Sequence, residues 1–238
     1  MKGYQRLARG LLAALLLAAI HTSALARPAQ PPGPVAAGRS AADLPASAQV
    51  GGIYGYGQLL ALSCESRSAA DWARYFGVGI HEMEFLARLP KTGNPETGFA
   101  GDVNGGWGNL PPEGYGVHAG PVARVLRTYG AQARAVRWMT FDQLRAEIAA
   151  GRPVIVWVTG HVAPGRGVDL RLDGQIVRVA RYEHTVIVVG YDATTLTILD
   201  GKMVYRRPVE TFLKAWAPLE NMAITWDAAL EPAGGPRD

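Results

Sequence analysis

The sequence is very poor in cysteine, because Cys64 is the only one among 238 residues. A single cysteine excludes a disulfide within the chain and a zinc site built from several thiolates. It must therefore be buried, reactive or paired with another molecule. The segment 81–85 (HEMEF) begins like a zinc-protease helix but has Phe85 where the second histidine belongs. We expect no metal and no cofactor.

Long hydrophobic runs are scarce as well. The longest, Leu11–Ile20, has ten residues, whereas a membrane span needs about 20. Three basic residues precede it and Ala24-Leu25-Ala26 follows it, which is the pattern of a secretory signal peptide over residues 1–26. We therefore expect an exported protein, periplasmic or extracellular, with no stable membrane span after the signal is cleaved.

An excess of positive charge is also missing from the expected mature chain. The formal net charge is +4, and three of these charges (Lys2, Arg6 and Arg9) lie in the predicted signal peptide. The remaining charge of about +1 gives no electrostatic basis for binding nucleic acid. We expect no nucleic-acid partner.

The composition divides the chain into four segments. After the signal peptide, residues 27–49 are rich in proline and alanine and predict a flexible linker. Residues 50–230 are long enough for one sizeable domain without disulfides, and residues 231–238 predict a disordered tail. The sequence contains no internal repeat that would indicate a second domain.

Within the domain, helical periodicity comes first and strand patterns follow. We expect helices beginning at Cys64 and over His81–Leu89, Ala119–Tyr129, Thr140–Ala150 and Val209–Trp216. Thr140 and Gln143 fit a capping box. Expected strands are Val154–Val158, Gln175–Val179, His184–Tyr191, Leu196–Leu199, Met203–Tyr205 and Ala223–Trp226. Helices followed by an antiparallel meander predict an α+β fold.

Cys64 has the surroundings of a nucleophile. It is expected at the first turn of a helix, where the helix dipole lowers a thiol pKa, with the Ser63 hydroxyl as N-cap. Gln58, six residues earlier, offers a side-chain amide for the oxyanion formed by a thiol attack. The alternative is that Cys64 is a small buried hydrophobic residue.

A base and its orienting group are found in the strand region. His184 opens the most hydrophobic strand, and Asp200 ends the next one. Antiparallel pairing with a tight turn at 192–195 would bring them together. We expect Asp200 to accept the Nδ1–H of His184, leaving Nε2 to take the proton of Cys64. The alternative is a structural histidine beside a surface aspartate. His118 and His161 are expected to be exposed loop residues.

These elements together resemble the C39-like peptidase family of papain-like thiol hydrolases. The resemblance covers roughly residues 50–227 and rests on four features: Gln58 six residues before Cys64, the strand HTVIVVGYD from His184 to Asp192, Asp200, and connecting blocks at 115–118, 151–158 and 212–216. It implies a papain-like cysteine peptidase fold, with N-terminal helices followed by an antiparallel sheet.

The resemblance also implies roles for four residues. Cys64 would be the nucleophile, His184 the base, Asp200 the orienting group, and Gln58 the oxyanion donor together with the backbone N–H of Cys64. The chain departs from the family at Glu65 and Gly201, where members often have glycine and proline. A carboxylate beside the nucleophile raises the thiol pKa and opposes the helix dipole.

The resulting prediction is an exported cysteine peptidase that cleaves peptide or protein substrates through a thioester. Two alternatives stay open. One is an amidase or transpeptidase acting on envelope material, and the other is a non-catalytic peptide-binding module on the same fold. The long segment 90–116, rich in glycine, asparagine and proline, is expected to form one wall of the substrate cleft.

Overall fold

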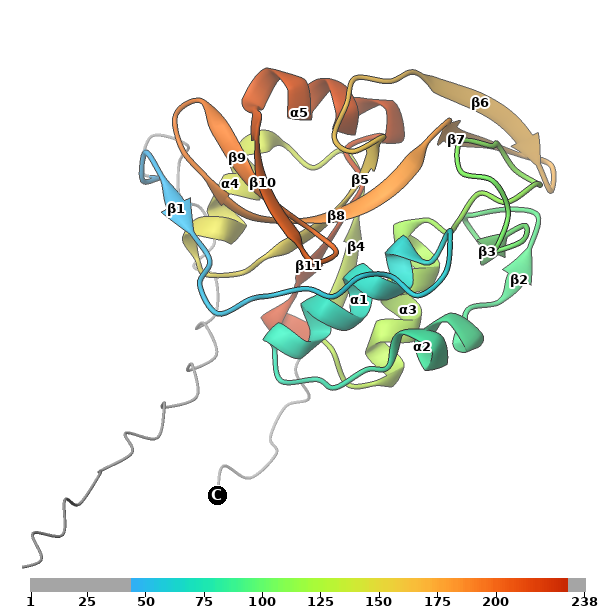
Figure 1. The fold of residues 1–238 in the computed structure, drawn as a ribbon, viewed down its shortest axis with the longest axis horizontal. Coiled ribbons are helices and arrows are strands. Elements are labelled where there is room, and N and C mark those ends of the chain that lie inside the picture. Colours follow the sequence, from blue (N-terminus) through green and yellow to red (C-terminus); the bar gives the residue numbers. More distant parts are fainter. Residues whose placement is uncertain (1–43, 231–238) are drawn as a thin grey trace, which may run out of the picture. The chain divides into compact units, whose positions relative to one another are not determined.

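The computed structural model describes residues 44–230. The predicted signal peptide, the linker up to residue 43 and the predicted tail lie outside these residues. Ala48–Gln49, placed in the linker from the sequence, form the short strand β1, which pairs antiparallel with strand β8 (Figure 1). The folded region therefore begins two residues before the predicted boundary at residue 50.

One antiparallel sheet of seven strands organises the fold. Six of them lie in the order β10-β9-β8-β5-β11-β4, and β1 joins at β8. Their bounds are β4 Ala133–Val136, β5 Val154–Thr159, β8 Glu183–Tyr191, β9 Thr195–Asp200, β10 Met203–Pro208 and β11 Ala223–Trp226. The α+β class is confirmed, but the expected simple meander is wrong, because the last strand, β11, lies between β5 and β4.

Four further strands lie outside this sheet. β6 (Gly167–Leu172) and β7 (Gln175–Ala180) form a separate hairpin that extends from one end of the sheet (Figure 1). β2 (Lys91–Thr92) and β3 (Phe99–Ala100) make a short parallel pair. The long segment 90–116 therefore contains some regular structure.

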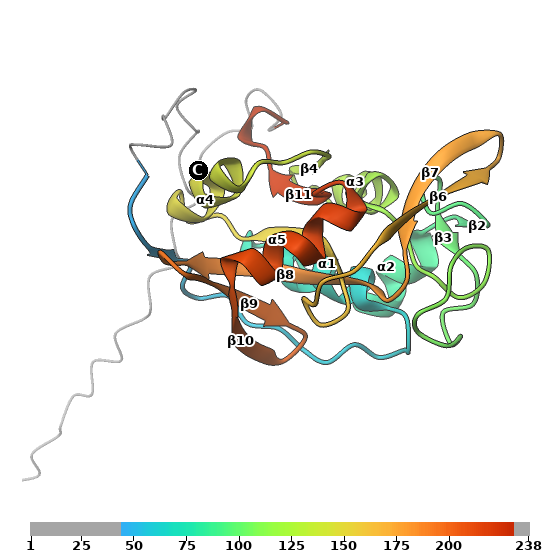
Figure 2. The same cartoon turned by 90° about the horizontal axis from the view of Figure 1, so that it is seen from above.

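Within residues 44–230 there are five α-helices, and they agree with the predicted ones to within about two residues. They are α1 Cys64–Tyr75, α2 Glu82–Arg88, α3 Ala119–Thr128, α4 Phe141–Ala149 and α5 Val209–Trp216, and two short 3-10 helices follow at Ala217–Leu219 and Ala228–Leu230. The capping box of α4 is present, with both reciprocal hydrogen bonds between Thr140 and Gln143. Figures 1 and 2 show α1, α2 and α3 on one side of the sheet and α5 on the other.

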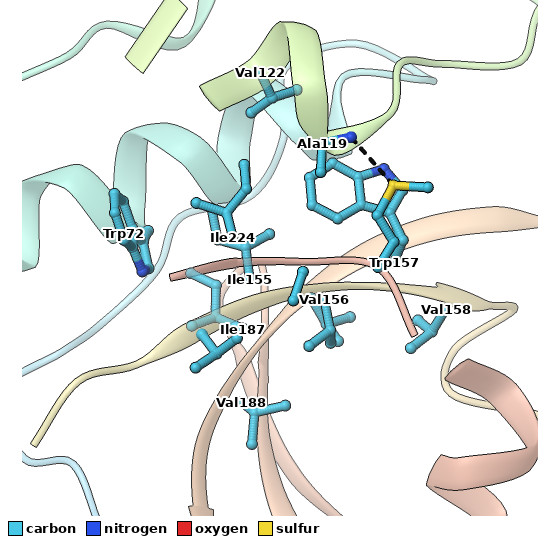
Figure 3. Packing of buried hydrophobic residues seen from close by; sticks show 14 of the residues in the cluster. Trp72, Ala119, Val122, Ile155, Val156, Trp157, Val158, Ile187, Val188 and Ile224 are labelled. Atoms are coloured by element: carbon cyan, nitrogen blue, oxygen red, sulfur yellow. Dashed lines mark hydrogen bonds between the residues drawn. The ribbon is translucent and has the colours of Figure 1, made fainter. Parts of the chain in front are cut away.

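Coverage on both sides explains why the central strands are buried throughout. All residues of β5 and β8 are buried, as expected for strands with both faces covered. Trp72 of α1 and Trp157 of β5 are completely buried in this core, and the backbone N–H of Ala119 donates to the sulfur of Met222 (Figure 3). Each large buried side chain contributes about 1.5–3 kcal/mol. None of the helices between residues 44 and 230 has the length and hydrophobicity to cross a membrane.

Candidate active site

Cys64 is the first residue of α1, and a buried glutamate of α2 fixes the turn before it. Glu82 accepts hydrogen bonds from the backbone N–H of Leu59 (2.9 Å) and from the Ser63 hydroxyl (2.6 Å). Ser63 holds the N-cap position, but its side chain makes no capping hydrogen bond. The expected cap is therefore wrong, because the Ser63 oxygen accepts the Leu60 N–H at 3.1 Å within the preceding turn instead of an N–H of α1.

Side-chain hydrogen bonds join α1 to the strand that carries His184. The Thr185 hydroxyl donates to the Ser68 hydroxyl at 3.2 Å, and Ser68 donates to the Thr185 carbonyl at 3.3 Å. This places the first turn of α1 beside the start of β8. Cys64 and His184 consequently line the same cavity, whose volume is about 210 Å³.

His184 and Asp200 form a buried pair at the edge of this cavity. The ring Nε2 lies 2.8 Å from Asp200 Oδ1, as the antiparallel pairing of β8 and β9 led us to expect. The two ring nitrogens are exchanged relative to our prediction, however, which placed Nδ1 at Asp200 and Nε2 at the thiol. Because Asp200 engages Nε2, Nδ1 is the nitrogen left for the thiol.

Asp200 is held as a carboxylate by several donors. Burial alone would raise its pKa, but hydrogen bonding to His184 and the positive charge of His184, together with the Tyr205 hydroxyl, outweigh burial and lower the pKa to about 2. The Tyr205 hydroxyl donates to Oδ2 at 2.9 Å. The carboxylate can therefore keep the imidazole of His184 in one orientation.

His161 is a site residue that the sequence analysis missed. Its side chain is 58% exposed, as expected of a loop residue, yet its Nδ1 lies 3.2 Å from Asp200 Oδ2 and its ring lines the cavity. It follows β5 by two residues, and only the β5–β8 pairing brings it to His184. No local pattern around His161 signals this.

Gln58 lines the cavity, but its amide is engaged elsewhere. Its Nε2 donates to the carbonyls of Leu60 and Ala61, at 2.8 and 2.9 Å. Both amide hydrogens are therefore used within the loop. The role of Gln58 as oxyanion donor stays a prediction.

Two buried glutamates lie next to the thiol. The Cys64 Sγ donates to Glu65 Oε2 at 3.3 Å, and Glu65 Oε1 accepts the Val117 N–H at 2.6 Å. Glu183 is 3% exposed, and neither of its carboxyl oxygens has a hydrogen-bond partner among residues 44–230. Glu183 was not predicted as a site residue, although an acidic residue at the start of an apolar strand was an available signal in the sequence.

The thiol is not activated in this conformation. Burial, followed by the negative charges of Glu65 and Glu183, raises the pKa of Cys64 well above its usual value. These effects outweigh the lowering that a position at the start of a helix favours. The predicted opposing effect of Glu65 is present, with burial as the larger contribution.

The segment 90–116 supplies one wall of the cavity, as expected. Trp107 and Tyr115 line it. The indole Nε1 of Trp107 donates to the Glu183 carbonyl at 2.9 Å, and its ring lies against His161 and His184 with centroid distances of 5.2 and 6.2 Å. Trp107 therefore covers the imidazoles while its own ring remains 42% exposed.

His118 lies outside this cavity, and its expected exposure is wrong. It is completely buried at the N-terminus of α3, with Nδ1 2.5 Å from Glu96 Oε1. Arg137 pairs with both Glu96 and Glu220. His118 is buried because these four side chains, which are distant in the sequence, come together in the fold. The loop sequence around His118 does not indicate this.

Two groups of side chains within residues 44–230 bring possible metal-ligand atoms within 4.8 Å of one another. One consists of His161, His184 and Asp200, and the other of Cys64, Glu65 and Glu183. The first group is internally hydrogen-bonded through Asp200. The second has the unpartnered carboxyl group of Glu183.

Comparisons with known proteins identify the family. The model of the Peptidase_C39 like family matches residues 49–224. No curated protein matches the sequence. The crystal structure of a C39-like peptidase from Bacillus anthracis is similar, with 24% identity, a TM-score of 0.67, and coverage of 76% of this chain and 96% of that one.

Two other solved structures are less similar. The peptidase domain of Streptococcus ComA, a bifunctional ABC transporter of a quorum-sensing pathway, has 14% identity and a TM-score of 0.43, covering 74% of this chain and 99% of that one. Xylellain, a cysteine protease from Xylella fastidiosa, has 14% identity and a TM-score of 0.42, covering 79% of this chain and 87% of that one. The fold is shared with the Bacillus anthracis protein, and the family match spans most of the chain: this protein belongs to the Peptidase_C39 like family.

Proposed function

We propose that this protein is an exported cysteine peptidase that cleaves peptide bonds with Cys64, His184 and Asp200. The observation that carries the proposal is the 2.8 Å contact between His184 and Asp200 in a cavity that Cys64 also lines. The family and the fold support a cysteine peptidase. A module that only binds peptides has no need of a nucleophile, a base and an orienting carboxylate together.

The proposed reaction begins with proton transfer from the Cys64 Sγ to Nδ1 of His184. The thiolate attacks the substrate carbonyl, the C–N bond breaks, and His184 gives the proton to the departing amine. Water then attacks the thioester, His184 takes a proton from it, and the acid product leaves as the thiol is restored. Asp200 holds the imidazole through Nε2 in both steps.

The thiol must first leave its contact with Glu65. In the structure Sγ donates to Glu65 Oε2, so the S–H group has to turn away from Glu65 before His184 can take the proton. The proposed oxyanion site consists of the backbone N–H of Cys64 and the Gln58 amide. Gln58 would have to release the carbonyls of Leu60 and Ala61 to serve there. Substrate binding would supply the energy for both movements.

The test is a peptide-library digestion with product masses read by mass spectrometry. We expect the reduced wild-type protein to release new amino and carboxyl termini, and Cys64→Ser and His184→Ala to release none. Matched circular dichroism spectra would show that the variants fold. Cleavage retained in Cys64→Ser would contradict the thioester route, and a product joined to an amine would indicate a transpeptidase.

Export is proposed from the sequence of residues 1–26 alone. We expect a protein expressed from the full gene in a bacterial host to be recovered outside the cytoplasm with its N-terminus at Arg27. Intact-mass measurement of the recovered protein tests this. A cytoplasmic protein that keeps Met1–Ala26 would contradict it.

A further inference from the structure

The proposed reaction leaves two buried carboxyl groups beside the nucleophile without a role. Glu65 follows Cys64 in α1, and Glu183 precedes His184 in β8, so each of the two proposed catalytic residues has a carboxyl group beside it in the sequence. Both side chains are at most 3% exposed. One oxygen of each and the Cys64 Sγ lie within 4.8 Å of one another.

No positively charged side chain within residues 44–230 pairs with either glutamate. Among the described residues, no ion pair includes Glu65 or Glu183, and Glu183 also lacks any hydrogen-bond partner. Buried charges are ordinarily paired or bound to a metal ion. A buried carboxyl group without such a partner takes up a proton, and a cation that enters this place can replace that proton.

The backbone leaves space for the carboxyl groups. Gly116 lies against both of them, and a Cβ built there would come within 2.2 Å of Glu65 Oε1 and 2.8 Å of Glu183 Oε2. Gly116 also has φ +137°, in the region that favours glycine. A side chain at residue 116 would therefore displace the two acids from their present positions beside Sγ.

The donor atoms determine which cation fits. One thiolate and two carboxylates suit a borderline soft ion such as Zn²⁺ or Co²⁺ better than Mg²⁺ or Ca²⁺, which prefer oxygen alone. In a tetrahedral zinc site, with Zn–S about 2.3 Å and Zn–O about 2.1 Å, sulfur and oxygen are about 3.6 Å apart. The Sγ–Oε2 distance of 3.3 Å is close to this value.

We propose that Cys64, Glu65 and Glu183 form a binding site for one zinc-class divalent cation, which withholds the sulfur of Cys64 from reaction while it is bound. The thiol proton, together with any proton held by the two carboxyl groups, leaves to solvent as the metal binds. Cys64 and Glu183 both line the cavity, so the cation has a route of entry and a fourth position for water. The binding itself is independent of the proposed function, whereas its inhibitory effect rests on it.

The first experiment is a titration of the reduced, chelator-treated full chain with Co²⁺, followed by absorption spectroscopy. We expect one equivalent to bind and to give a thiolate-to-cobalt charge-transfer band. Cys64→Ser should abolish the band. Glu183→Gln should weaken binding by at least about tenfold, since loss of outer-shell partners alone costs 10–100-fold. Glu65→Gln is the second carboxyl variant, in case Glu183→Gln fails to fold.

His161→Ala is the matched control, because it removes a ligand from the other possible metal group while leaving the proposed one intact. Its Co²⁺ spectrum and affinity should equal those of the wild type. If Co²⁺ binding is lost in His161→Ala and retained in Glu183→Gln, the ion binds at His161, His184 and Asp200, and the proposal fails. It also fails if the wild-type protein gives no charge-transfer band.

The second experiment measures alkylation of Cys64 by iodoacetamide with and without Zn²⁺. We expect Zn²⁺ to slow alkylation at least about tenfold in the wild type and in His161→Ala, with EDTA restoring the rate and Mg²⁺ having no effect. Unchanged alkylation in saturating Zn²⁺ would overturn the proposal. Neither experiment needs peptidase activity, so a chain without turnover that still binds Co²⁺ would contradict the proposed function and leave the metal site standing.

Discussion

Asp200 accepts hydrogen bonds from three side chains. Substitutions of Asp200 can therefore distinguish its orienting effect on the His184 ring from the effect of its negative charge. Asp200→Asn keeps an acceptor for Nε2 of His184, and we expect a loss in kcat of about tenfold. Asp200→Ala removes the acceptor and frees the imidazole to rotate, and we expect a loss of about 10²–10⁴-fold, the range attributed to a positioned acid or base. Steady-state kinetics on the best library peptide measures both.

Tyr205→Phe is the control for this comparison. It removes one donor to Asp200 Oδ2 and leaves the His184 contact intact, so its kcat should fall less than that of Asp200→Ala. Equal kcat values for Asp200→Ala and the wild type would show that His184 needs no orienting group, which contradicts the proposed role.

At the scale of residues, the sequence predicts contacts between neighbouring elements better than contacts between distant ones. His184 and Asp200 belong to two consecutive strands with a tight turn, so their meeting follows from local pattern. Glu183 and His161 become site residues only through the packing of α1 and β5 against β8. The choice of ring nitrogen also depends on this packing, which no spacing in the sequence determines.

Among the helices, α4 offers the clearest test of a local signal. Thr140 accepts the Gln143 N–H at 3.2 Å, and the Gln143 side chain accepts the Thr140 N–H at 2.8 Å. We expect Thr140→Ala to lower the free energy of unfolding by about 1 kcal/mol, the usual effect of losing an N-cap, and Thr140→Ser to change it little. Urea denaturation followed by circular dichroism measures both, and equal midpoints for Thr140→Ala and the wild type would contradict the prediction.

The segment 90–116 is expected to act on turnover through Trp107. Trp107→Ala removes the ring that lies against His161 and His184 and the hydrogen bond to the Glu183 carbonyl. We expect kcat/KM to fall about tenfold, because loss of precise positioning at a reacting centre costs up to about 10²-fold. Trp107→Phe keeps an aromatic cover and should retain more activity.

Deletion of the whole segment 90–116 also tests whether this segment contributes to turnover. From the sequence we expect this deletion to destroy turnover while leaving the fold intact. The structure shows a difficulty, because Glu96 and Tyr115 of this segment are tied to buried His118, so the deletion also removes structural contacts. Trp107→Ala is therefore the sharper variant, and unchanged kcat/KM in it would contradict a role for this wall.

The strands that were not predicted from the sequence include a local one, β6, which pairs with the adjacent β7, and one that depends on long-range pairing, β4. β4 has only four residues and a single buried position among them, so its strand pattern is weak. It exists because β11, about 90 residues later, pairs with it. The insertion of β11 between β5 and β4 changes the order of the sheet without leaving any periodic signal in the sequence.

Across the whole molecule, one charged network connects parts that are far apart in the chain. Glu96 in the long segment contacts His118 at the start of α3, and Arg137, which follows β4, pairs with Glu96 and with Glu220 near α5. Only 27% of the Glu96 side chain is exposed. The network therefore fixes the segment that carries Trp107 to the helical side of the fold.

This network predicts how stability depends on pH. Burial alone would raise the pKa of Glu96, but hydrogen bonding to His118, the charge of His118 and the charge of Arg137 outweigh burial and lower the pKa to about 2. Because the folded-state pKa is below the unfolded value of 4.5, the unfolded chain binds the proton first. The stabilisation is thus complete above pH 4.5 and is lost as the pH falls from 4.5 towards 2, by up to about 3 kcal/mol.

Glu96→Gln should remove this part of the pH dependence. We expect its free energy of unfolding at pH 6 to be lower than that of the wild type by up to about 3 kcal/mol, and the difference to shrink towards pH 2 as the wild-type carboxylate is protonated. Glu84→Gln is the matched control, because Glu84 pairs with Arg88 on an exposed face, where ion pairs contribute little. Urea denaturation between pH 2 and pH 7 measures all three proteins, and parallel curves for Glu96→Gln and the wild type would show that Glu96 is not held as a carboxylate by His118 and Arg137.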